Sequence, residues 1–80
     1  MDNTQIMADI TEIFRSVFDD DTLDISRETT AEDIEDWDSL EQINLLVAME
    51  HKFGIKFKLE DVSALENVGD MADLVARMTV

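Results

Sequence analysis

The stretch DWDSLEQINLLVAMEHKFGI, residues 36–55, contains the start, body and end of one helix. Two pairs near its beginning, Asp38 with Glu41 and Ser39 with Gln42, have the three-residue spacing of a capping box. In that arrangement a side chain at the helix start accepts a hydrogen bond from an amide of the first turn. We therefore predict that a helix begins at Asp38-Ser39, with either pair forming its cap.

The same helix carries more apolar side chains than one buried stripe requires. Gly54 suits the left-handed conformation that ends many helices, so we expect the helix to end at Phe53. Its apolar residues before that point are Leu40, Ile43, Leu45, Leu46, Val47 and Met49. Part of this apolar surface should therefore face a partner instead of the chain's own core.

The spacing of these residues separates an outer face from an inner one. Leu40 and Val47 are seven residues apart, nearly two helical turns, so both should point outward as an exposed patch. Glu41 and Glu50 should form the rim of this patch. The buried face should instead contain Leu45, Met49 and Phe53, which follow a four-residue repeat.

Two further amphipathic helices flank this one. The first should begin near Asn3 or Thr4, either of which can cap its first turn, and end before the acidic run 19–21. Its apolar stripe consists of Ile6, Ile10, Ile13, Phe14 and Val17. The last helix should be capped by Asn67, with Asp70 three residues on. It should bury Val68, Met71, Leu74, Val75 and Met78.

The connections between these helices are unequal. Residues 19–38 form a long connection that contains no glycine or proline, so we expect an ordered path beneath the helices. Residues 55–59 alternate apolar and charged, which favours a short extended segment with Ile55, Phe57 and Leu59 facing inward. A short helix over 59–65 should follow, and residues 1–80 should form a single domain.

The charge of the chain is strongly negative and unevenly distributed. Six Lys and Arg residues face twenty Asp and Glu residues, for a formal net charge of -14, and residues 1–50 hold fifteen of the acids. Nucleic acids and anionic membranes would be repelled, so neither is an expected partner, whereas basic protein surfaces are. The longest apolar run, 45–49, is too short to span a bilayer. No secretory signal begins the sequence, so we expect a cytoplasmic protein.

The acidic run does not have the pattern of a calcium-binding loop. An EF-hand loop needs glycine at its sixth position and a bidentate acid at its twelfth. A loop starting at Asp19 would place Asp24 and Thr30 there, and the register from Asp20 fails at the same two positions. The sequence contains no cysteine, which excludes thiolate ligands. We therefore expect no dedicated metal site.

Catalysis by the chain itself is also disfavoured. Ser39 and His51 are the candidates for a nucleophile and its base, but they lie twelve residues apart on one predicted helix. At 1.5 Å per residue their backbones would be about 18 Å apart, beyond the reach of a hydrogen bond. The two glycines, Gly54 and Gly69, do not form a phosphate-binding loop. We therefore expect no catalytic residues and no intrinsic enzymatic activity.

Ser39 has two interpretations. From Asp38-Ser39-Leu40 alone, an ordinary serine at a helix start is the favoured one. The context gives it a second interpretation, because the serine lies between a long acidic loop and a helix with exposed apolar surface. A hydroxyl there points outward, and a helix N-terminus favours an attached phosphate. Ser39 is therefore also a suitable residue to anchor a phosphodiester-linked arm.

Residues 36–55 resemble the motif of acyl carrier proteins, and the similarity extends from Ile6 to Met78 in length, helix order and acidity. The resemblance implies an all-α four-helix bundle with a short third helix and a long loop between the first two helices. It implies that Ser39 carries 4'-phosphopantetheine, transferred from coenzyme A by a phosphopantetheinyl transferase. Asp38 and Leu40 would be recognition residues beside it.

The resemblance also implies a function. The chain would hold acyl groups as thioesters and present them, as a monomer, to acyl-transferring and acyl-modifying enzymes with basic docking surfaces. Its departures from the family motif, Asp36-Trp37 before the serine, Asn44 and His51-Lys52, leave fatty-acid, polyketide, modified-lipid and amino-acid-derived pathways open. There are two alternatives to an acyl carrier. One is a peptidyl or aryl carrier, and the other is a helical interaction module that never receives the arm. Trp37 would be a core-edge residue, or else a wall beside the arm or a partner contact.

Overall fold

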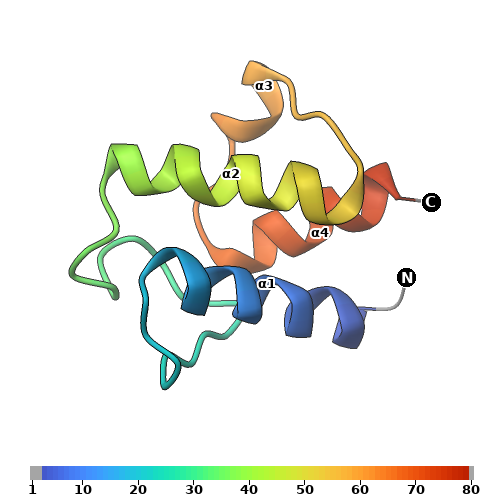
Figure 1. Ribbon diagram of the computed structural model, residues 1–80. Helices are drawn as coiled ribbons and strands as arrows, with labels where there is room; N and C mark the ends of the chain where they lie inside the picture. The colour runs from blue at the N-terminus through green and yellow to red at the C-terminus, as the bar shows by residue number, and fades with distance from the viewer. Residues whose placement is uncertain (1–2, 80) are drawn as a thin grey trace.

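The computed structural model describes residues 3–79, which form four helices and no strand. The helices are α1 (Asn3–Val17), α2 (Ser39–Phe53), α3 (Leu59–Val62) and α4 (Val68–Met78). The expected all-α four-helix bundle, with a short third helix and a long loop between the first two, is confirmed (Figure 1). Within residues 3–79, no helix is long and apolar enough to cross a membrane.

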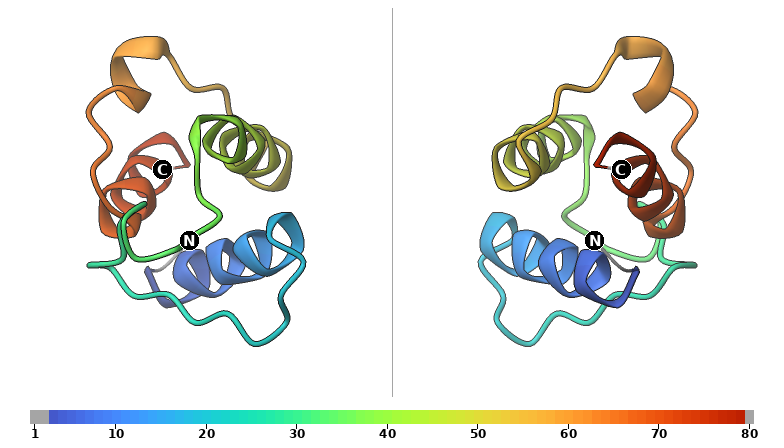
Figure 2. Two further views of the ribbon diagram at one scale, coloured as in Figure 1. Left: turned by 90° about the vertical axis from the view of Figure 1, so that its left-hand side faces the viewer. Right: turned by 90° about the vertical axis from the view of Figure 1, so that its right-hand side faces the viewer.

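The three longer helices surround one apolar core, with α3 outside it (Figure 2). α1 contacts both α2 and α4. The predicted stripe of α1 supplies Phe14, which is fully buried, and α2 supplies Leu45 and Met49. The remaining fully or nearly buried apolar residues include Ile6, Ile10, Val68, Met71 and Val75. The apolar periodicity of the sequence therefore identified the core faces of all three helices.

The helix ends differ from the predictions in detail. α1 includes both Asn3 and Thr4 in its first turn, so neither of the two predicted residues is its cap. At α4 the predicted cap is confirmed, because Asn67 Oδ1 accepts a hydrogen bond of 2.8 Å from the Asp70 amide. Met78 is only half-buried, contrary to prediction, because it is the last residue of α4.

The long connection between α1 and α2 is ordered by hydrogen bonds at both of its sides. On the α1 side, Arg15 Nε donates to the Leu23 carbonyl at 2.8 Å. On the α4 side, the Gly69 amide donates to the Arg27 carbonyl at 2.8 Å. A side chain at position 69 would bring its Cβ to 2.9 Å from that carbonyl oxygen, so the close approach requires glycine. The Arg27 guanidinium also donates hydrogen bonds to the Asp73 carboxylate, and these raise the pKa of Arg27.

The segment between α2 and α4 differs from the predictions in the length of α3 and in the exposure of Leu59. α3 ends at Val62, three residues before the predicted end. Ile55 and Phe57 are half-buried as expected, but Leu59 is 83% exposed. The alternating pattern stops at Leu59 because α3 begins there, and a helix changes the direction in which successive side chains point.

Candidate functional site

The start of α2 places Ser39 at the surface. Asp38 has an extended backbone, with φ -114° and ψ -171°, and its Oδ1 accepts a hydrogen bond of 2.9 Å from the Glu41 amide. Asp38 is therefore the N-cap, and the alternative pair of Ser39 with Gln42 is wrong as a cap. Ser39 is the first helical residue, and it is exposed. Its hydroxyl is not needed to cap the helix.

This geometry predicts that Asp38, and not Ser39, stabilises the start of α2. Replacing Asp38 with alanine should lower the free energy of unfolding by about 1 kcal/mol, because the Glu41 amide loses its acceptor. Urea unfolding followed by circular dichroism would measure this loss. An Asp38→Asn variant, which retains a capping oxygen, is the control and should lose much less. Equal losses in both variants would contradict the capping role.

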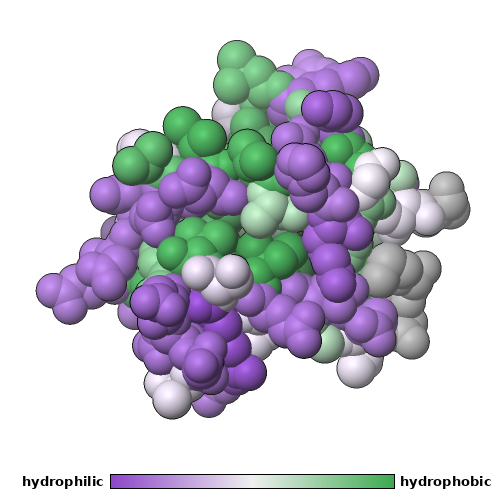
Figure 3. Space-filling view, in the orientation of Figure 1, coloured by the Kyte–Doolittle hydropathy of each residue, from purple (hydrophilic) through white to green (hydrophobic). Residues whose placement is uncertain are grey.

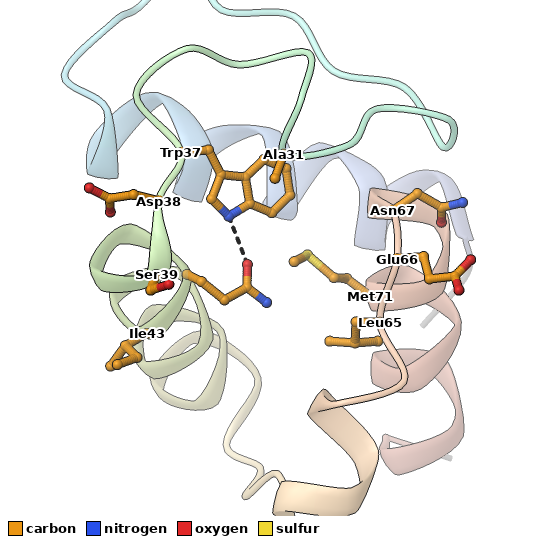
Figure 4. Close-up of a pocket in the computed structure, with 10 residues that line it drawn as sticks. Ala31, Trp37, Asp38, Ser39, Ile43, Leu65, Glu66, Asn67 and Met71 are labelled. Atoms are coloured by element: carbon orange, nitrogen blue, oxygen red, sulfur yellow. Dashed lines mark hydrogen bonds between the residues drawn. The ribbon is translucent and has the colours of Figure 1, made fainter.

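A cavity of about 590 Å³ lies beside Ser39, between α2 and the N-terminal part of α4 (Figure 4). Ser39 and Ile43 line it from α2, whereas Leu65 and Met71 face it from the opposite side. The other lining residues are Ala31, Trp37, Asp38, Gln42, Glu66 and Asn67. An exposed hydroxyl thus stands at the edge of a cavity with both apolar and polar walls.

Trp37 is a core-edge residue, as the first of its interpretations expected. The side chain is 9% exposed and packs edge-on against Phe14, with ring centroids 5.1 Å apart and an interplanar angle of 84°. Its Nε1 donates a hydrogen bond of 2.7 Å to Oε1 of Gln42. Trp37 therefore belongs to the edge of the core and at the same time forms a wall of the cavity beside Ser39.

An apolar patch on α2 consists of Leu40, Ile43 and Val47, which are 65%, 57% and 46% exposed. The predicted exposure of Leu40 and Val47 is confirmed, and Leu45 and Met49 are fully buried as expected. Phe53, which was predicted to be buried with them, is only half-buried, because it is the last residue of α2. Figure 3 shows apolar side chains over α2 on this face. Ile43 was missing from the predicted patch, although its spacing of three residues from Leu40 and four from Val47 places it on the same face.

The two acids expected at the rim of this patch are half-buried and hold other groups in place. Glu50 Oε2 accepts a hydrogen bond of 2.8 Å from the Phe57 amide and so fixes the segment after α2. Glu41 Oε1 accepts one of 3.0 Å from Nδ2 of Asn44. Both carboxylates retain further acceptor capacity for a basic partner.

His51 lies near the opposite end of α2 from Ser39 and is exposed. Twelve residues of helix separate their backbones by about 18 Å. The pair therefore does not form a nucleophile with its base.

The chain is similar to known proteins over most of its length, including the start of α2. The family described as phosphopantetheine attachment site matches residues 8–75. The acyl carrier protein of Acidothermus cellulolyticus is 36% identical over 76 residues, which cover 95% of this chain and 90% of that protein. The meromycolate extension acyl carrier protein of Mycobacterium leprae is 32% identical over 92% of this chain, and this alignment spans 64% of that protein.

A solved structure has the same fold. It is the solution structure of the holo acyl carrier protein from Geobacter metallireducens, with a TM-score of 0.85 and 50% sequence identity. The match covers 90% of this chain and 83% of that one.

Proposed function

The chain belongs to the acyl carrier protein family, and we propose that Ser39 is the residue that bears its 4'-phosphopantetheine group. The observation that carries this proposal is the position of Ser39 as an exposed first residue of α2 at the edge of the cavity. The positive end of the α2 dipole lies there and favours a phosphodiester. Since Asp38 caps the helix, the Ser39 hydroxyl is available for modification.

The prosthetic group supplies the thiol on which acyl intermediates are held as thioesters. The chain itself contains no cysteine, so its residues position the group and present it to enzymes. Tethering the acyl group in this way replaces diffusion with a high effective concentration at each enzyme. We propose that the chain acts as a carrier and not as a catalyst, that residues 1–80 form one carrier domain, and that it works as a cytoplasmic monomer.

A thiol titration tests the proposal directly. The unmodified protein should show no thiol even when denatured, because no cysteine contributes a background. Incubation with coenzyme A and a broad-specificity phosphopantetheinyl transferase should produce one thiol per chain, which acylation then removes. A folded protein that never acquires a thiol would instead indicate an interaction module that carries no arm.

We further propose that the apolar patch of Leu40, Ile43 and Val47, with Asp38, Glu41 and Glu50 around it, docks partner enzymes. These partners are the phosphopantetheinyl transferase and acyl-transferring or acyl-modifying enzymes with basic docking surfaces. The net charge of -14 would steer such surfaces toward the carrier. The exposed apolar side chains would then be buried in the contact.

A Val47→Asp variant should lower kcat/KM of the transferase severalfold, because a charge would enter an apolar contact. Its free energy of unfolding should change by no more than about 0.5 kcal/mol, since Val47 is 46% exposed and lies outside the core. Steady-state kinetics and urea unfolding measure the two effects. An Ala8→Asp variant is the matched control, because Ala8 is an exposed position on α1. Equal kinetic losses in both variants would contradict docking at Val47.

A further inference from the structure

A second cavity, of about 500 Å³, lies at the C-terminal end of α2, at the other end of the helix from Ser39. It is lined by Val47, Glu50, His51, Gly54, Ile55 and Lys56. Val47 also belongs to the apolar patch of α2, so the second cavity continues that patch toward the end of the helix. His51 follows Val47 by four residues, which places both on the same face of α2.

The second cavity has apolar walls and open space above its glycine. Val47 is 46% exposed and Ile55 is half-buried, so both can contact an apolar group from another molecule. Gly54 has a left-handed backbone, and a Cβ built on it would meet no atom within 4 Å. This combination of an apolar wall and free space suits an apolar side chain of a partner.

The charged residues of the second cavity are not neutralised by one another. Lys56 and His51 line it and are both exposed. Within residues 3–79 Lys56 forms no ion pair, although the chain contains twenty Asp and Glu residues. The one carboxylate in the lining, that of Glu50, already accepts a hydrogen bond of 2.8 Å from the Phe57 amide. The Lys56 ammonium group can therefore donate to a carboxylate of another molecule.

The dipole of α2 explains only part of the positive charge at this end. His51 and Lys52 lie in the last turn of α2, where the negative end of the dipole favours cations. Lys56 lies beyond the helix, in the segment that leads to α3 (Figure 1). Its position beside an apolar cavity therefore has no explanation in the stability of α2.

The proposed docking face thus changes sign along its length. The acidic residues beside the apolar patch at its beginning are Asp38 and Glu41, whereas Lys56 and His51 line the cavity at its end. A partner with a uniformly basic surface would place like charges opposite Lys56, which is unfavourable.

From this arrangement we infer that the second cavity receives an apolar side chain of a partner enzyme, next to a carboxylate of that enzyme that pairs with Lys56. The inference rests on the proposed docking surface of α2 and adds the charge that its partner must present. The partner surface is basic opposite Asp38 and Glu41 and acidic opposite Lys56. Opposite pairings at the two ends allow one orientation of the partner along α2 and disfavour the reverse.

Two dipeptide amides, N-acetyl-leucyl-glutamate and N-acetyl-leucyl-lysine, are the probes for this surface. Their binding to the unmodified protein is followed by NMR through the backbone amides of His51, Gly54 and Lys56. The net charge of -14 alone favours the lysine peptide, so a preference for the glutamate peptide requires a local basic site. We expect the glutamate peptide to shift these resonances and to bind more tightly. An equal or stronger response to the lysine peptide, or no response to either, would overturn the inference.

A pair of lysine variants locates the contact. Lys56→Gln should weaken binding of the glutamate peptide about threefold, the ratio that an exposed ion pair supplies. Lys52→Gln is the matched control, because it makes the same change outside the cavity, about 140° around the axis of α2 from Val47. Thermal unfolding verifies that both variants are folded.

The control should bind the glutamate peptide as the wild type does. Equal weakening in both variants would assign the effect to net charge and overturn the inference. Neither the arm nor the transferase enters this experiment. A negative result would therefore leave the attachment at Ser39 and the transferase contact at Val47 unaffected.

Discussion

Replacing Ser39 with alanine is expected to abolish phosphopantetheine attachment completely while leaving the protein folded. The attachment requires a hydroxyl, and alanine offers none. Stability should change by no more than about 0.5 kcal/mol, because Ser39 is exposed and Asp38 provides the cap. Intact mass after incubation with coenzyme A and the transferase measures the first effect, and urea unfolding measures the second.

A Ser16→Ala variant is the control for this experiment. Ser16 is also an exposed helical serine, but it lies near the end of α1. This variant should be modified as completely as the wild type. Modification of the Ser39→Ala variant, or its loss in the Ser16→Ala variant, would contradict the proposed site.

The largest loss of stability is expected from Phe14→Ala. Phe14 is the largest fully buried side chain, and it contacts both Phe18 and the Trp37 ring beside the cavity. Truncating a buried phenylalanine costs about 3–5 kcal/mol. A domain of this size rarely has more than about 3–5 kcal/mol in total. The variant should therefore be largely unfolded, as measured by far-UV circular dichroism and by the loss of cooperative urea unfolding.

Phe18→Ala provides the comparison. Its ring lies 5.9 Å from that of Phe14, but the side chain is only half-buried. This variant should remain folded with a smaller loss of stability, since it removes less buried surface. A Phe14→Ala variant that unfolds cooperatively with a loss below about 1 kcal/mol would contradict the central role of Phe14 in the core.

The sequence was sufficient to predict the three longer helices because each carries a strong local signal. These signals are the apolar periodicity of α1 and α4, the cap at Asn67 and the glycine at position 54. Each of them determines the conformation of only a few neighbouring residues. Gly54 takes the predicted left-handed conformation, with φ 66°. The exposure of Leu40 and Val47 also followed from helical spacing alone.

The features that were not predicted depend on contacts distant in sequence or on a choice between similar local signals. Two capping pairs at the start of α2 were equivalent by spacing. In the structure Asp38 has the extended backbone of a cap and accepts the hydrogen bond from the Glu41 amide, whereas the Gln42 side chain accepts one from Trp37. The exposure of Leu59 depends on where α3 begins. The N-cap residue there, Lys58, makes no capping hydrogen bond with its side chain, so the sequence gives no clear signal for the start of α3. The cavity is lined by residues of α2 and by residues near Asn67, which are distant in sequence. Local sequence patterns therefore could not predict it.

Peptide-level mass spectrometry tests most directly whether Ser39 carries the prosthetic group. The wild-type protein is incubated with coenzyme A and a broad-specificity transferase, digested and fragmented. We expect that one phosphopantetheine group is added per chain and that fragmentation assigns it to Ser39. A folded protein that gains no mass, or one that carries the group on another residue, would contradict it.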